Sequence, residues 1–215
     1  TAQQVGVDAT NDAFIIKESP AGYEFERFER KFGNDPVIVA GVDLPSGLTA
    51  STADDIAALQ AELEKLPQVD SVHALSGQTE HRMRWFGRIE ERPLLGDLRS
   101  GKETPEQFLA RRKTWPPEAA RLISADGRTV AFMIFVRPDP ARAGWSGVIA
   151  DIRKTFRASP FAGSGTALTG TVVEQDAFGT QIDLDRKTFV PLCVAVIVTL
   201  LVLFHLDLRT VVYGL

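Results

Sequence analysis

The sharpest contrast between apolar and polar positions lies near the C-terminal end of the chain. Residues 188–206 contain no Asp, Glu, Lys or Arg, whereas charged side chains recur every few residues before them. At a rise of about 1.5 Å per residue, a helix of this length crosses a hydrocarbon layer about 30 Å thick. A buried helix of a soluble protein usually keeps a polar face, but between Phe189 and Phe204 only Cys193 and Thr199 are mildly polar. We therefore predict a membrane-spanning helix, with Pro191 in its first turn, where the missing N–H does little harm.

The pattern ahead of this segment begins with a strand, a helix and a second strand. Residues 36–42 form a short apolar run that is typical of a buried strand. A helix is predicted at residues 52–66, with Ser51 as the N-cap and Asp54 as an acidic N3 residue. Its apolar stripe consists of Ile56, Leu59, Leu63 and Leu66. A second strand is predicted at residues 69–75.

A hairpin and a second helix–strand pair follow. Residues 121–124 and 129–136 are predicted to pair across a turn that contains Asp126 and Gly127, because Asp-Gly is a strong hairpin signal. A helix at residues 145–156 has the stripe Trp145, Val148, Ile149, Ile152 and Phe156, and a short strand lies at residues 167–170. The order strand, helix, strand, strand, helix, strand predicts an α+β fold of the ferredoxin-like, split βαβ type. In that fold two helices cover one face of an antiparallel sheet.

A polar insertion at residues 77–120 interrupts this order. Residues 104–107 resemble a helix start, and residues 115–117 resemble a helix stop. The insertion is rich in basic residues, namely Arg82, Arg84, Arg88, Arg92, Arg111, Arg112 and Lys113. We interpret them as a solvated face, and the alternative is a contact with anionic lipid head groups or a partner domain.

Two further helices flank the sheet. Residues 22–32 form a predicted helix with Phe25, Phe28 and Phe32 in step. Residues 172–187 are amphipathic and are predicted to run straight into the membrane segment. The charges near that segment do not decide its orientation, and long preceding loops cross membranes largely regardless of charge.

Composition adds little chemistry to this outline. The chain has 215 residues and a formal net charge of −4, so it offers no broad basic surface for nucleic acid. Its single cysteine, Cys193, excludes an internal disulfide and is interpreted as packing within the apolar run. The start of the chain lacks the pattern of a signal peptide, and we expect the sequence to be a piece of a longer polypeptide.

No candidate residues have the spacing of an active site or a metal site. The three histidines, His73, His81 and His205, are not spaced as metal ligands. Ser46 and Ser164 lie in glycine-containing turns, and no general base is placed near them in the sequence. Asp183 and Asp185 are interpreted as surface carboxylates, with a role at a substrate or proton entrance as the alternative. We predict no enzyme, no catalytic residue, no cofactor and no metal.

Several short motifs, in their order ahead of a membrane helix, carry a family resemblance. They are FGND at residues 32–35, LEKLPQVDSV at residues 63–72, SADGRTVA at residues 124–131 and the pair Thr169-Gly170. The chain resembles the first extracytoplasmic loop and second membrane helix of the resistance–nodulation–division (RND) superfamily. It is most similar to the MmpL-like and hopanoid-transporter-like exporters, and the likeness covers nearly the whole chain.

This resemblance implies a proton-driven exporter of lipids or other hydrophobic or amphiphilic small molecules in the bacterial inner membrane. Its partners would be the lipid bilayer, the other parts of the same transporter polypeptide and the substrate, with a homo-oligomer left open. Residues 1–187 would be periplasmic, and the proton-coupling and substrate-binding residues are not assigned. The expected divisions are a lead from a missing first membrane helix (1–35), a porter-like domain (36–171), a connecting helix (172–187), the membrane helix (188–206) and the start of a cytoplasmic connection (207–215).

Two other functions stay open at this stage. One is a single-span membrane sensor or assembly protein whose periplasmic α+β domain binds a partner. The other is a membrane-anchored hydrolase with an unrecognised site, which a triple substitution of Ser46, Ser164 and His73 would test. The open face of the predicted sheet is the best place for a substrate or a second porter subdomain.

Overall fold

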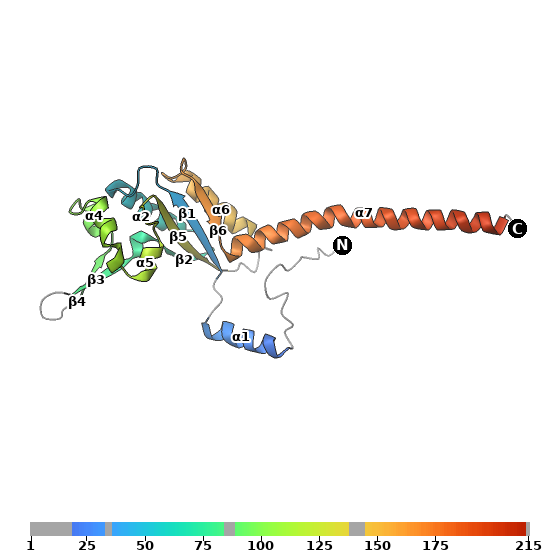
Figure 1. Cartoon of the computed structure of the whole chain (residues 1–215), viewed down its shortest axis with the longest axis horizontal. Helices are drawn as coiled ribbons and strands as arrows, with labels where there is room; N and C mark the ends of the chain where they lie inside the picture. Colours follow the sequence, from blue (N-terminus) through green and yellow to red (C-terminus); the bar gives the residue numbers. More distant parts are fainter. Residues whose placement is uncertain (1–18, 33–35, 84–88, 138–144, 214–215) are drawn as a thin grey trace. The chain divides into compact units, whose positions relative to one another are not determined.

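The computed structural model describes residues 19–32, 36–83, 89–137 and 145–213 (Figure 1). At residues 25, 26, 28–30, 32, 82, 83, 89 and 205–213 only the backbone is described. The expectations for residues 1–18, 33–35, Arg84, Arg88 and 214–215 therefore lie outside the described residues. The chain divides into two compact units, of which one is residues 16–174 and the other includes residues 175–215.

A four-stranded sheet organises the first unit. It consists of β1 (Val37–Asp43), β2 (Val69–His73), β5 (Thr129–Val136) and β6 (Thr166–Thr169), in the order β2-β5-β1-β6. All three neighbouring pairs are antiparallel. Helix α2 (Ala50–Glu64) connects β1 to β2, and α6 (Ser146–Ala158) follows β5 and precedes β6 in the chain (Figure 1). This is the predicted split βαβ connectivity, and the α+β fold class is confirmed.

The two faces of the sheet differ because alternate side chains of a strand point to opposite sides. Alternate residues of the central strands are buried, namely Ile38, Ala40, Val42, Val130, Phe132, Ile134 and Val136. They share one core with Ile56, Leu59 and Leu63 of α2 and with Ile149, Ile152 and Phe156 of α6. Phe132 and Phe156 meet edge to face at 5.8 Å between ring centroids. Both helices thus contribute their apolar stripes to the core on one face of the sheet.

The predicted start of the first sheet helix is wrong by two residues. Helix α2 begins at Ala50, and its N-cap is Thr49, not Ser51. Thr49 has extended backbone angles (φ −130°, ψ 173°), and Thr49 and Thr52 form a reciprocal capping box in place of the predicted Asp54 contact. The following strand also ends early, at His73, because residues 75–77 turn into a short 3-10 helix, η2 (Leu75–Gly77).

The predicted hairpin at residues 121–136 is only partly present. The Asp-Gly turn exists, with Gly127 at φ +71° as such a turn requires. The first arm is reduced to an isolated bridge between Ile123 and Val130. The chain before it is helical instead, because Pro117 starts the short helix α5 (Pro117–Arg121), and proline is favoured at that position.

The solvated face predicted from the basic residues of the insertion is only partly present, because Lys113 is exposed whereas Arg92, Arg111 and Arg112 are partly buried. The insertion forms a two-stranded sheet from β3 (Thr79–Met83) and β4 (Ile89–Pro93), followed by α3 (Gly96–Arg99), α4 (Pro105–Ala110), η4 (Arg111–Thr114) and α5. Its apolar side chains are buried in the main core, namely Leu94, Leu95, Leu98, Phe108, Trp115 and Ala119. The predicted helix start at Thr104 is confirmed as a capping box with Gln107.

The flanking helices are α1 (Pro20–Phe32) and α7 (Thr171–Tyr213). As predicted, the amphipathic residues 172–187 continue without a break into the apolar segment. Pro191 therefore lies inside a helix and not in a first turn. Because proline has no N–H, the Lys187 carbonyl cannot accept the helical hydrogen bond from position 191. The large apolar side chains of that segment are exposed, between 49% at Leu200 and 66% at Phe204. Within the described residues, α7 is the one helix long and apolar enough to cross a membrane.

Candidate functional site

The second face of the main sheet is not buried, and the strand register identifies its side chains. On the central strands these residues are Val37, Val39 and Gly41 and, opposite them, Phe135, Met133 and Ala131, all partly buried. The edge strands add Ser71 and His73 from β2 and Ala167 and Thr169 from β6. We call this surface the open face.

The open face is mostly apolar and has a low centre. Between the row of Val39 and the last row of the strand pair, Asp43 and Thr129, the residues Ala131, Gly41 and Ala167 lie side by side. A Cβ atom at Gly41 would meet no atom within 4 Å. The next row is taller, with Val39 opposite Met133. The His73 ring lies 5.1 Å from the Phe135 ring at one margin. Partly exposed apolar side chains around a shallow centre are suited to contact with another apolar surface or an apolar ligand.

The structure does not bring the candidate nucleophiles and bases together. His73 lies on β2 and Ser164 precedes β6, and these strands are the two opposite edges of the sheet. Ser46 is exposed in the turn after β1, where the Gly47 N–H donates to the Leu44 carbonyl at 2.9 Å. His81 lies on β3, 3.7 Å from the Glu91 carboxylate. Among the described residues, no three His, Cys, Asp or Glu side chains form a group that could hold a metal ion.

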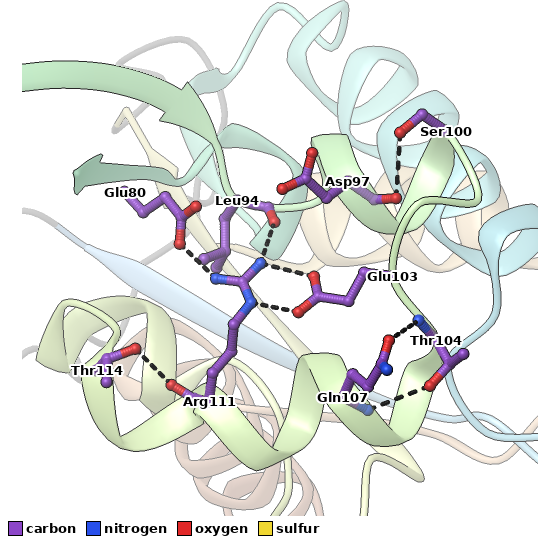
Figure 2. A network of polar contacts seen from close by, with 9 residues as sticks. All are labelled: Glu80, Leu94, Asp97, Ser100, Glu103, Thr104, Gln107, Arg111 and Thr114. Atoms are coloured by element: carbon purple, nitrogen blue, oxygen red, sulfur yellow. Dashed lines mark hydrogen bonds and ion pairs between the residues drawn. The ribbon is translucent and has the colours of Figure 1, made fainter. Parts of the chain in front are cut away.

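The insertion contains an ionic cluster that the sequence analysis missed (Figure 2). The Arg111 guanidinium lies between two carboxylates and bonds Glu80 through Nη1 and Glu103 through Nε at 2.5 Å and Nη2 at 2.8 Å. Nη2 also donates to the Leu94 carbonyl at 3.4 Å, and the guanidinium lies 5.2 Å from the Phe108 ring centroid. The hydrogen bond to Glu103 raises the pKa of Arg111 against the opposing effect of burial, so the side chain is charged. The sequence did predict a helix start at Thr104. A helix continued from there places Arg111 one turn after Phe108, so that the two side chains can meet.

The other basic residues of the insertion have local roles. Arg112 donates to the carbonyl of Ala120 in the last turn of α5, where a cation is favoured, and to that of Ile123, two residues after the helix ends. Arg92 lies 3.2 Å from Glu90 on the same strand. Lys113 is exposed and fits the predicted solvated face. Arg82 lies on β3, but its side chain is outside the description.

The carboxylates before the apolar segment make only local contacts in the described residues. Asp183 lies 3.5 Å from Arg186, and Asp185 accepts a hydrogen bond from Gln181 at 3.1 Å. Cys193 is a free, exposed thiol within the apolar segment. The side chain of His205 is outside the description.

Comparison with known proteins identifies the family. No curated protein matches the chain. The profile of the MMPL family matches residues 19–214, which include both the sheet domain and the apolar helix. Since this match covers nearly the whole sequence, the chain belongs to the MMPL family, a family of RND-type membrane transporters.

Proposed function

We propose that the chain is part of a proton-driven transporter that exports lipids or other hydrophobic or amphiphilic small molecules. The observation that carries this proposal is the MMPL match across a split βαβ domain and a directly following apolar helix. In the proposal, the open face contacts either the substrate or a second porter subdomain of the same polypeptide. Its apolar, partly exposed side chains support that role. No observation favours a single-span sensor or assembly protein.

We further propose that residues 1–187 lie in the periplasm and that the apolar part of α7 crosses the inner membrane. Labelling with a membrane-impermeant maleimide tests this sidedness. In a Cys193→Ser background, Ser46→Cys in the exposed turn after β1 should be labelled in cells whose outer membrane alone is permeabilised. Arg209→Cys should react only after the inner membrane is opened. The opposite labelling pattern would show that the chain has the opposite orientation in the membrane.

The role of the open face is tested by filling its low centre. Gly41→Val adds a side chain where a Cβ meets no atom within 4 Å, and the residue does not have a positive φ. Valine also favours strands, so the domain should be at least as stable as before. In the transporter polypeptide that contains this chain, we expect the variant to lose most of its export of a fluorescent lipid analogue from proteoliposomes.

The matched control is Gly163→Val, which also enters open space without a positive φ but lies in a loop away from the open face. It should transport normally. Dissipating the proton gradient with an ionophore should stop export by the unmodified transporter. Export that persists without the gradient would contradict proton coupling, and normal export by Gly41→Val would exclude a tight contact at the open face.

A further inference from the structure

A groove lies on the other side of the sheet, at its β6 edge. It is formed by β6, α6 and the loop of residues 159–165 that connects them. Its walls include Arg153, Phe156, Arg157, Ser164, Thr166 and Leu168. This groove is distinct from the open face because Thr166 and Leu168 alternate with Ala167 and Thr169, which lie on the open face.

The groove exists because the helical layer ends before the sheet does. Thr166 and Leu168 pair with Val42 and Ala40 on β1, and all four side chains point toward the helices. The two β1 residues are fully buried, whereas Leu168 is only partly buried and Thr166 is exposed. The edge strand is thus left partly uncovered beside α6.

Two arginines form one wall of the groove. Arg153 and Arg157 are one helical turn apart and flank the buried stripe of α6 that contains Ile152 and Phe156. Neither guanidinium has a hydrogen bond or ion pair within the part of the chain that the structure describes. Like charges at this spacing repel each other, and an anion bound between the two guanidinium groups would offset that repulsion.

The remaining walls suit an anion with an apolar attachment. Ser164, which is partly buried, lines the groove together with Thr166, and among the described residues no Asp or Glu does so. Phe156, only 3% exposed, and Leu168 supply an apolar surface beside the arginines.

The loop is held firmly enough to form a defined wall. Phe161 is 4% exposed, and the Ser164 N–H donates to its carbonyl at 2.9 Å. The Asp43 N–H donates to the Gly165 carbonyl at 3.0 Å. The Asp43 carboxylate, close to Gly165, accepts a hydrogen bond from Thr129 Oγ1 at 3.2 Å and is not part of the groove lining.

We propose that this groove binds a phosphate-type oxyanion through Arg153 and Arg157, with any apolar chain attached to the phosphate lying against Phe156 and Leu168. Two guanidinium groups present several donors to one oxyanion, which is the chemistry by which arginine recognises phosphate. The binding site goes beyond the transport function and does not depend on it.

The test measures binding by titration calorimetry on the full chain in maltoside micelles. The probes are inorganic phosphate, dihexanoyl phosphatidic acid and dihexanoyl phosphatidylcholine, whose phosphate is offset by a choline cation. We expect phosphatidic acid to bind and Arg153→Gln/Arg157→Gln to weaken that binding at least about tenfold, since hydrogen bonds to charged groups are among the strongest. The charge-matched control is Lys154→Gln/Arg121→Gln, because both residues are exposed and neither lines the groove.

The probes also separate two sources of the oxyanion. Binding of phosphatidic acid without inorganic phosphate would support a lipid head group, and comparable binding of both would support a free phosphate. Phosphatidylcholine should bind more weakly than phosphatidic acid. No binding of either phosphate probe, or equal weakening in the control, would overturn the proposal.

A stability measurement keeps the result unambiguous. Removing two repelling, exposed charges should leave the melting temperature of Arg153→Gln/Arg157→Gln unchanged or slightly higher. A clearly lower melting temperature would make the arginines structural and would also overturn the proposal. None of these readouts requires transport, so a failure here is distinguishable from a failure of the transport function.

Discussion

Replacing Arg111 by methionine is the most informative perturbation of the fold. Methionine keeps an unbranched apolar stem that can still pack on Phe108, but it removes the cation that bonds both Glu80 and Glu103. The exposed fractions of the three side chains are 18% for Arg111, 10% for Glu80 and 13% for Glu103. Two nearly buried carboxylates would then lose the cation that they share.

The expected loss follows from that burial. Removing one partner of a buried ion pair costs about 3–5 kcal/mol, because the remaining charge stays desolvated. The Leu94 carbonyl also loses a donor. An exposed pair gives the contrast: Arg99 bonds Asp54 at 2.6 Å, but the two side chains are 49% and 58% exposed. Arg99→Met should therefore cost at most about 1 kcal/mol.

Urea unfolding of the full chain in micelles, followed by tryptophan fluorescence, measures both variants. Trp115 is a suitable reporter because its ring lies 4.4 Å from Phe108. Adding Glu80→Gln and Glu103→Gln to Arg111→Met should restore part of the stability, since amides carry no charge. The reasoning is refuted if Arg111→Met destabilises the chain no more than Arg99→Met.

Three further predictions concern other parts of the chain. Gly170→Ala should cost about 1–3 kcal/mol in the same assay, because Gly170 has φ +110° and a Cβ there would lie 2.5 Å from the Val37 carbonyl; a neutral result would contradict the geometry. The Ser124 hydroxyl and then the Arg128 N–H lower the pKa of Asp126, so its contribution to stability is lost as pH falls through the lowered pKa. In Asp126→Asn the melting temperature should accordingly fall less steeply as the pH is lowered from about 5 to about 2, and an unchanged slope would count against this. Leu200→Arg should disfavour insertion by about 2.5–3.5 kcal/mol and lower the carbonate-resistant fraction, unlike Leu184→Arg outside the apolar segment.

The parts of the fold that could be predicted from the sequence are those with a local pattern. The alternation of β5, the stripe Ile56-Leu59-Leu63 of α2 and the apolar segment of α7 each depend on neighbouring residues alone. The start of α2 could not be placed as reliably, because Thr49, Ser51 and Thr52 all have hydroxyls able to cap it, and backbone geometry selects among them.

The rest depends on contacts between distant residues. Strands β3 (TEHRM) and β4 (IEERP) are polar on both sides, so no alternation marks them. Phe108 and Trp115 lie in a short, mostly polar stretch without a clear apolar period, and their burial depends on contact with the main core. Arg111 can be buried because Glu80, 31 residues earlier, lies within reach. Likewise, the sequence predicted that the sheet has an open face, but identifying the residues on that face required the register between β1, β5 and β6.

The pairing of β1 with β6 determines how mechanical force would act on the sheet domain. Because Val39 pairs with Thr169 in antiparallel strands, the start of β1 and the end of β6 lie at the same end of the sheet. Gly170 allows this close approach to Val37. If α7 and the chain before β1 were pulled in opposite directions, the force would separate the two strands from that end. Their hydrogen bonds would break one after another and would not share the force. The central pair β1–β5 would not lie in the direct line of force, so the domain should yield first at β6 while its core stays intact.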